Sequence, residues 1–198
     1  MATPRRVVLA TGNAGKLREF NALLAPLSIE LIPQGELGII GADETGTTFE
    51  ANALLKARHA AQAARLPALA DDSGIEVDAL EGRPGVWSAR YAGPQASDAD
   101  NNALLLTGLQ CVPPARRTAR YRCVIAYVRD GGDPSPMIAR GSWEGTIADA
   151  PAGAGGFGYD SLFIPTGFAL TAAQIPAATK NALSHRAIAL AELLRLLQ

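Results

Sequence analysis

A short glycine-containing segment near the start of the chain has the residue types of an anion-binding loop. In order, its residues are Thr11, Gly12, Asn13, Ala14, Gly15 and Lys16. An apolar run that predicts a strand precedes it, and a run of helical periodicity follows it. Backbone N–H groups at such a helix N-terminus can bind phosphate, and Lys16 would add a positive charge. Leu17 stands where a Walker loop has Ser or Thr, so a Walker loop is excluded. The alternative is an ordinary turn with a solvated lysine.

Two adjacent carboxylates, Asp71 and Asp72, follow the apolar residues 68–70. In extended chain, neighbouring side chains point to opposite faces, so one carboxylate should face a given site. Magnesium prefers carboxylate oxygens, and a second carboxylate could come from Asp43 or Glu44. The same group could take a proton from an attacking water. The alternative is a polar turn whose aspartates cap backbone groups.

Residues 153–160 form a glycine-rich segment with two aromatic rings, Phe157 and Tyr159. The segment satisfies G-x-G-x-x-G, but no clear strand precedes it and no helix follows, which argues against a Rossmann loop. Phe157 could stack on a base and Tyr159 could support it. The alternative is a surface loop whose aromatic rings enter the core.

Hydrogen-bond donors crowd the expected start of the last helix, where Lys180, His185 and Arg186 lie close in sequence. Such a group suits an acceptor-rich ligand, either phosphate oxygens or the carbonyls of an oxo-base. Metal ligation by His185 has little support, because the other histidine, His59, lies in an expected helix without ligand spacing. The chain also lacks the G-x-S-x-G elbow of many serine hydrolases.

The elements that must position these segments alternate between strand and helix and then become strand-rich. Apolar runs predict strands at 6–10, 29–32, 68–70 with a possible continuation at 75–77, and an antiparallel pair at 118–128 and 137–147. Helical spacing predicts helices at 17–24 (ending before Pro26), from a Thr47 cap to about 66, at 97–109 and at 184–197. This order predicts a mixed α/β protein with its polar loops at strand ends, where such proteins place ligands.

Length and composition exclude several classes of protein. The chain has 198 residues, which suits one domain, and its 48% apolar and 19% charged content argues against disorder. The net charge of −1 makes a nucleic-acid-coating protein unexpected. No apolar run approaches the roughly 20 residues of a membrane span, and the run after Arg6 is too short for a signal peptide. Cys111 and Cys123 are expected to be reduced, buried thiols of a cytoplasmic protein.

In their joint order and spacing, these segments resemble the inosine triphosphate pyrophosphatase family, the dITP/XTP pyrophosphatases that remove noncanonical purine nucleotides. The stretches that carry the resemblance run nearly from end to end: 9–13 with Lys16, 44–50, 52–57, 70–74, 82–91, 155–160 and 184–186. The resemblance implies a single α/β domain over 1–198. That domain would have a long twisted mixed β-sheet, flanking helices and two lobes around a central nucleotide cleft. It also implies a homodimer, magnesium dependence, and hydrolysis of ITP, dITP or XTP to monophosphate and pyrophosphate.

The resemblance also assigns roles to residues of this chain. Asp72 would be the proton acceptor for water, and Glu44 and Asp72 would engage Mg²⁺. Thr11, Gly12, Asn13, Ala14, Gly15 and Lys16, with Lys56, would hold the triphosphate, and Ser73 would contact the nucleotide. The base pocket would consist of Phe157, Gly158, Tyr159, Asp160, Lys180, His185 and Arg186. The chain departs from the family pattern at Ala51, often a second acid, and at Ser161, often a proline.

Base choice follows from hydrogen bonding. Inosine and xanthosine present a carbonyl at the purine six-position, where adenine presents an amino group. A buried donor left unpaired costs about 1–3 kcal/mol, so two mismatches could give roughly 10²- to 10⁴-fold discrimination. Guanine carries the same carbonyl, so its exclusion needs a further feature. Two alternatives remain: a non-catalytic nucleotide sensor, and a pyrophosphatase for modified pyrimidine nucleotides. Neither nucleic acid nor a membrane is an expected partner.

Overall fold

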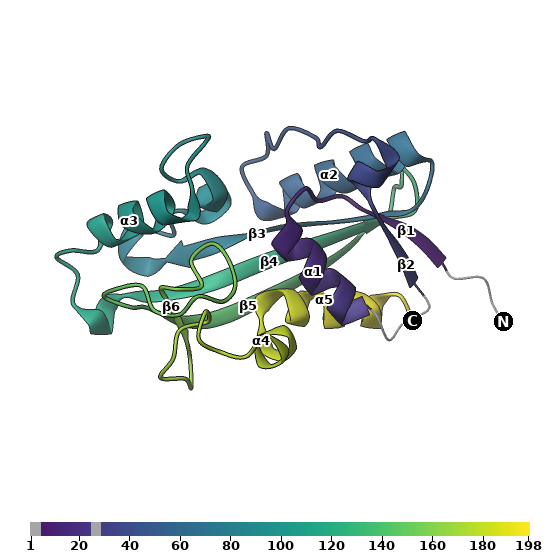
Figure 1. Ribbon diagram of the computed structural model, residues 1–198. Helices are drawn as coiled ribbons and strands as arrows, with labels where there is room; N and C mark the ends of the chain where they lie inside the picture. Colours follow the sequence, from purple (N-terminus) through teal and green to yellow (C-terminus); the bar gives the residue numbers. More distant parts are fainter. Residues whose placement is uncertain (1–4, 25–28) are drawn as a thin grey trace. The chain divides into compact units, whose positions relative to one another are not determined.

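The computed structural model describes residues 5–24 and 29–198 (Figure 1). The strands are β1 (Arg5–Leu9), β2 (Ile29–Pro33), β3 (Ala68–Val77), β4 (Thr118–Val128), β5 (Met137–Ile147) and β6 (Phe163–Pro165). The α-helices are α1 (Ala14–Leu24), α2 (Phe49–Ala64), α3 (Asp98–Gly108), α4 (Ala177–Leu183) and α5 (His185–Leu196). The 3₁₀ helices of the described residues are η1 (Gln34–Leu37), η2 (Asp78–Leu80), η3 (Gly85–Arg90) and η4 (Pro114–Arg116). Pro26, the expected stop of the first helix, lies outside the described residues.

The six strands form one sheet in the order β2-β1-β3-β4-β5-β6. Strand β1 pairs in parallel with both β2 and β3, whereas β5 and β6 pair antiparallel. The sheet is therefore mixed and has helices flanking it, which confirms the predicted fold class. No helix in the described part of the chain has the length and apolar character to cross a membrane.

The chain divides into two compact units. The first comprises Met1–Asp72, Cys123–Gly141 and Ala187–Gln198, and the second comprises Ser73–Arg122 and Ser142–Arg186. Strands β3, β4 and β5 each contribute residues to both units.

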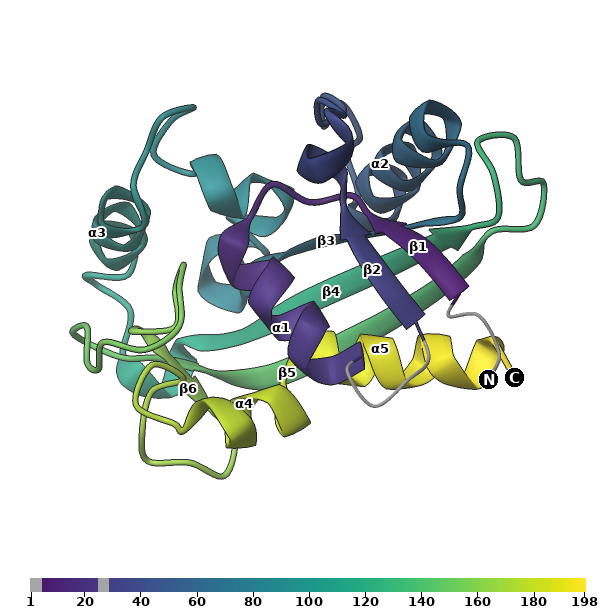
Figure 2. The same cartoon turned by 45° about the vertical axis from the view of Figure 1, so that its right-hand side comes forward.

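In the first unit, strand alternation separates two apolar cores. Val8 of β1 packs in a cluster with the alanines of α2, whereas Val7 and Leu9 pack in a second cluster with α1 and α5. Figures 1 and 2 show α2 and α5 on opposite faces of these strands. The α2 contribution is made of small residues at helical spacing, namely Ala53, Ala57, Ala60 and Ala61. Small side chains let the helix approach the strands closely and hold its polar face in a fixed position.

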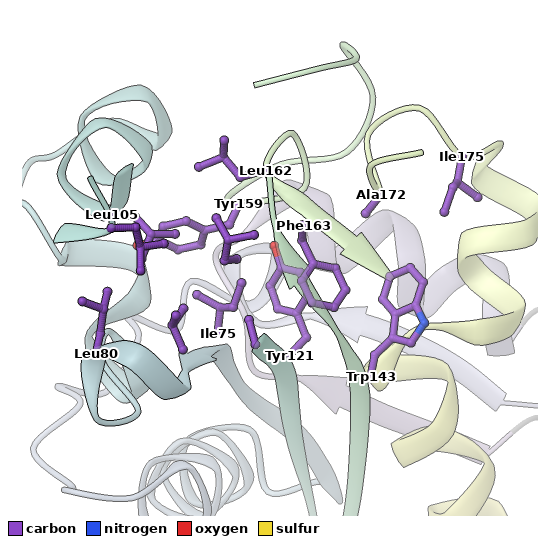
Figure 3. Close-up of a cluster of buried hydrophobic side chains, with 14 residues drawn as sticks. Ile75, Leu80, Leu105, Tyr121, Trp143, Tyr159, Leu162, Phe163, Ala172 and Ile175 are labelled. Carbon is purple, nitrogen blue, oxygen red and sulfur yellow. The ribbon is translucent and has the colours of Figure 1, made fainter. Parts of the chain in front are cut away.

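The second unit has its own core, built around aromatic rings (Figure 3). Tyr121 of β4 meets the ring of Phe163 edge-on at 4.8 Å between centroids, and Trp143 of β5 lies 5.5 Å from the same ring. Leu105 of α3 and Tyr159 belong to this cluster. The core thereby fixes the segment that carries Tyr159.

Several details differ from the sequence prediction. Strand β3 continues through Asp71 and Asp72, so the polar-turn interpretation of these residues is wrong. The cap of α2 is Thr48, whose hydroxyl accepts from the Ala51 N–H at 3.1 Å, rather than Thr47. Neither α4 nor β6 was expected. Cys123 is buried as predicted, but Cys111 is exposed, which corrects the prediction of two buried thiols.

Candidate functional site

The predicted anion-binding loop ends in a capped helix. The Asn13 side-chain oxygen accepts from the backbone N–H groups of Gly15 at 2.8 Å and Lys16 at 3.1 Å. These two helix N-terminal groups therefore already have a partner within the loop. The Lys16 ammonium lies 2.8 Å from the Asp71 carboxylate, whose side chain is fully covered. Lys16 is thus held against β3 by a buried charge rather than pointing freely into solvent.

Beside this loop, two carboxylates converge on one ammonium group. Lys56 Nζ donates to Glu44 Oε1 at 2.7 Å and to Asp72 Oδ1 at 3.0 Å. The other Asp72 oxygen accepts from the Asn52 amide at 3.2 Å. Asn52 and Lys56 are four residues apart and therefore share one face of α2. Asp43 is exposed, so of the two candidate acids it is Glu44 that reaches this group.

Burial sets the protonation behaviour of the cluster. Desolvation raises the pKa of Asp72, and the positive charges of Lys56 and Lys16 partly oppose that rise. Burial alone would lower the pKa of Lys56, but the surrounding charges of Asp72, Asp71 and Glu44 outweigh it and raise that pKa. Lys56 therefore stays protonated, and Asp72 is more basic than an ordinary aspartate. A carboxylate of this kind is suited to accept a proton.

The carboxylates of Glu44 and Asp72 share a single cation, the Lys56 ammonium. Within the described residues, no group of three or more His, Cys, Asp or Glu side chains is gathered for a metal ion. Two carboxylates nevertheless fit magnesium, which usually keeps several waters and takes one or two protein carboxylates. The donor set is therefore compatible with a hydrated divalent ion.

A second cluster lies in the other unit and centres on a buried ion pair. Lys180 Nζ lies 2.6 Å from Asp160 Oδ2, and both side chains are less than a tenth exposed. The same carboxylate oxygen accepts from the Phe157 N–H at 3.0 Å. The Lys180 ammonium and the Arg186 guanidinium lie 5.1 and 5.8 Å from the Phe157 ring centroid. Phe157 is thus held between its own loop and two cations.

The imidazole of His185 stacks on a ring that the sequence did not single out. Its plane is 7° from that of Tyr121, with 4.6 Å between the centroids. Burial, followed by the charge and hydrogen bond of Asp160, raises the pKa of Tyr121 well above its usual range. Tyr121 therefore contacts both His185 and Asp160. Arg186, the next residue, donates to the Ser73 hydroxyl at 3.1 Å.

The path of the glycine-rich segment 153–160 requires glycine where the backbone lies close to a side chain or has a positive φ. A Cβ on Gly156 would lie 2.0 Å from Asp160 Oδ2, so only glycine fits there. Gly158 has a φ of +63°, a conformation that favours glycine. The Tyr159 hydroxyl donates to the Ser88 carbonyl at 2.8 Å, and its ring is buried in the core. Tyr159 therefore anchors the segment to the core. This agrees with the alternative interpretation for Tyr159, in which the aromatic rings of this segment enter the core.

The donors expected at one helix start belong to two helices. Lys180 lies in α4, whereas His185 and Arg186 open α5. Packing, rather than a shared helix end, brings Lys180 and Arg186 to the Phe157 ring, whereas His185 stacks on Tyr121.

Further residues touch the predicted ones, among them Asn52, Asp71 and Tyr121. Asn52 could have been found from its four-residue spacing to Lys56, which places both on one face of a helix. Asp71 was recognised as an acid, but its partner Lys16 lies 55 positions earlier in the chain. Nothing in the sequence marks Tyr121, because an alternating strand pattern does not say which ring lies beneath a functional residue.

Comparison with known proteins gives a consistent result. Residues 7–196 match the model of the Ham1 family. The dITP/XTP pyrophosphatase of Xanthomonas oryzae is 55% identical and that of Methylococcus capsulatus 56% identical, each over 96% of this chain and 95% and 94% of the relative. A Ham1 protein from Coxiella burnetii superposes with a TM-score of 0.90 at 46% identity, covering 98% of both chains. A structure from Mycobacterium abscessus described as nucleoside-triphosphatase / dITP/XTP pyrophosphatase gives 0.76 at 41% identity, covering 96% of this chain and 98% of that one.

Proposed function

Because the chain belongs to the Ham1 family, we propose that it hydrolyses noncanonical purine nucleoside triphosphates (ITP, dITP and XTP) to the monophosphate and pyrophosphate. Relatives more than half identical over nearly the whole chain are named as dITP/XTP pyrophosphatases, which supports this activity. The observation that carries the proposal is the buried Asp72 carboxylate, which shares the Lys56 ammonium with Glu44.

Asp72 would accept the proton of the water that attacks the α-phosphorus. Its raised pKa suits that role, and the hydrogen bonds from Asn52 and Lys56 fix the orientation of both its oxygens. Lys16, held beside the loop by Asp71, and Lys56 would supply positive charge toward the triphosphate. Residues 11–15 would contribute backbone and side-chain polar groups around the phosphates.

We further propose that the enzyme depends on Mg²⁺, held by Glu44 and Asp72. When bound, the ion would neutralise charge on the triphosphate and stabilise the pyrophosphate leaving group. The carboxylate donors support a hard cation. Removal of divalent ions with EDTA is expected to abolish turnover, and excess Mg²⁺ is expected to restore it.

The base would be recognised by the second cluster. Ser73, adjacent in sequence to Asp72, would contact the nucleotide, and Phe157 would stack on the purine. Lys180, His185 and Arg186 supply hydrogen-bond donors for the six-carbonyl of an oxo-purine. The adenine amino group could not accept from these donors. Gly158, Tyr159 and Asp160 would form and support the pocket.

The test is pyrophosphate release from ITP, XTP and dITP with Mg²⁺, compared with ATP and GTP. We expect faster turnover of the first three. Equal turnover of all five would remove the specificity claim. Tight ITP binding without product over hours would indicate a non-catalytic nucleotide sensor. A preference for modified pyrimidine nucleotides would indicate a pyrophosphatase for that class of substrate.

We also propose a cytoplasmic homodimer, in keeping with a substrate from the nucleotide pool.

A further inference from the structure

One helix holds the base-side loop from outside the residues so far discussed. Asp98 Oδ2 of α3 accepts from the Gly158 N–H at 2.6 Å. The amide of Asn102, one turn further along α3, donates to the Gly158 carbonyl oxygen at 3.1 Å. Both polar groups of one residue in the Phe157–Asp160 segment are therefore bound by side chains of the same helix.

The geometry of α3 explains why these two side chains act together. Asp98, Asn102 and Leu105 recur at spacings of four and three residues, so they share one face of the helix. Leu105 is fully buried in the aromatic core that also contains Tyr159 (Figure 3). The core therefore fixes the orientation of this face of α3. Asp98 and Asn102 lie on the same face and bind the loop from it.

A further contact of Asn102 strengthens the connection. The Asn102 amide also lies 3.4 Å from the Ser161 hydroxyl, at the position where the resemblance led us to expect a proline. Proline has no side-chain hydroxyl, so it could not offer this acceptor. Asn102 is buried, and its side-chain oxygen has no hydrogen-bond partner. The amide nitrogen of Asn102 is thus directed to the loop while its oxygen stays unpaired. An unpaired buried acceptor costs free energy, and the contacts with the loop must offset that cost.

The loop needs such a restraint because it is rich in glycine. Gly156 and Gly158 have positive φ values of 75° and 63°, and glycine backbone samples many conformations. Phe157 lies between these two residues, and its ring faces Lys180 and Arg186. A displaced Gly158 peptide would therefore displace the ring expected to stack on the base.

We propose that Asp98 and Asn102 are positioning residues that hold the Gly158 peptide, and through it Phe157, in the arrangement that binds the purine base. This inference rests on the proposed function for its substrate. When only a fraction of molecules has the competent loop, apparent affinity falls by that fraction. Loss of the Asp98 contact should therefore act on KM and on base selectivity, and leave the hydrolytic step largely intact.

The test compares Asp98→Ala with Asp100→Asn in the same first turn of α3. The Asp100 carboxylate accepts from the Ser97 N–H and hydroxyl, so its variant perturbs the helix start without touching the loop. We expect Asp98→Ala to raise KM for ITP about tenfold with kcat changed less than about twofold, since one charge-assisted hydrogen bond is lost. Asp98→Asn, which keeps an acceptor oxygen, should recover most of the loss. Asp100→Asn should leave KM unchanged.

Hydrogen exchange of the ligand-free protein provides a readout independent of activity. In Asp98→Ala and Asn102→Ala, amides of residues 157–161 should exchange about tenfold faster, and in Asp100→Asn they should not. Unchanged exchange in Asp98→Ala, or equal KM effects of the Asp98 and Asp100 variants, would overturn the proposal. A wild-type protein that releases no pyrophosphate from ITP would instead contradict the proposed function, and the exchange result would still decide whether α3 restrains the loop.

Discussion

Asp72 is the residue on which the proposed hydrolytic reaction would depend. The Asp72→Asn variant keeps the shape of the side chain and an oxygen that can accept from Lys56, but an amide cannot take a proton from water. We expect kcat to fall by roughly 10²- to 10⁴-fold, the usual contribution of a general base, with nucleotide affinity largely retained. Pyrophosphate release and calorimetric titration with ITP measure the two quantities separately. Full activity of the variant would refute the assigned mechanism.

Asp43→Asn is the matched control for this experiment. Asp43 precedes Glu44 in the same loop but is exposed, whereas Glu44 contacts Lys56. Its loss is expected to leave turnover within about twofold of the unsubstituted protein, as is usual for surface changes.

His185 offers a separate test of base recognition. Phenylalanine at this position can keep the parallel stack on Tyr121, but it removes the ring nitrogens that could donate to an oxo-purine. We expect His185→Phe to raise KM for ITP about tenfold while leaving the weak turnover of ATP nearly unchanged. A Michaelis analysis with both nucleotides measures this change in selectivity. A parallel rise for ATP would show that the imidazole does not read the base.

At the scale of elements, β3 shows what a sequence pattern can and cannot give. Its apolar start was predicted from Ala68 to Ala70, but its course through two adjacent aspartates was not. Polar residues usually end a buried strand because their burial is costly. Here the cost is offset by Lys16 and Lys56, which lie far away in sequence. A local pattern contains no information about such distant partners.

Short elements were missed for a related reason. Strand β6 has three residues and α4 has seven, so neither is long enough to establish a period. Both depend on packing instead, as β6 shows by placing Phe163 in the aromatic core. By contrast, the capping box of Ser97 and Asp100 was recognisable, since both of its hydrogen bonds are local.

The turn between β4 and β5 gives a prediction about stability. The buried carboxylate of Asp133 accepts from the Arg129 guanidinium and backbone N–H and from the Ser135 N–H, which together hold its pKa well below the usual range. A carboxylate with a lowered folded-state pKa stabilises the protein above its unfolded pKa of about 3.9 and loses that effect as the pH falls further. Asp133→Asn should therefore lower the melting temperature at pH 7, and the difference should shrink below about pH 4.

Thermal melts of both proteins from pH 7 to pH 3 test this expectation. The control is Asp130→Asn in the same turn, because the Asp130 carboxylate bonds the Gly132 N–H instead of the Arg129 guanidinium. A melting difference for Asp133→Asn that stayed constant down to pH 3 would mean that its charge contributes nothing.

At the scale of the whole molecule, order along the chain was the informative signal. Each motif on its own had an ordinary structural explanation, and their joint spacing indicated one family, which the match over residues 7–196 confirms. The chain carries a net charge of only −1, so in the proposed mechanism attraction of a polyphosphate would depend on local groups such as Lys16 and Lys56 rather than on overall charge. The two lobes around a nucleotide cleft, and the assigned site residues, remain predictions.

Association of two chains is the last expectation at this scale. In the single chain, several large apolar side chains are exposed to solvent. Among them are Trp87 of η3, which is 54% exposed, and Leu104 of α3, which is 39% exposed. A dimer that buried either segment would remove this apolar area from water. We expect light scattering to give twice the chain mass of 20.6 kDa, and Trp87→Glu or Leu104→Glu to reduce it to that of one chain. Leu170→Glu, at a 47% exposed leucine outside both segments, is the control and should stay dimeric. A single-chain mass for the unsubstituted protein at micromolar concentration would contradict the homodimer.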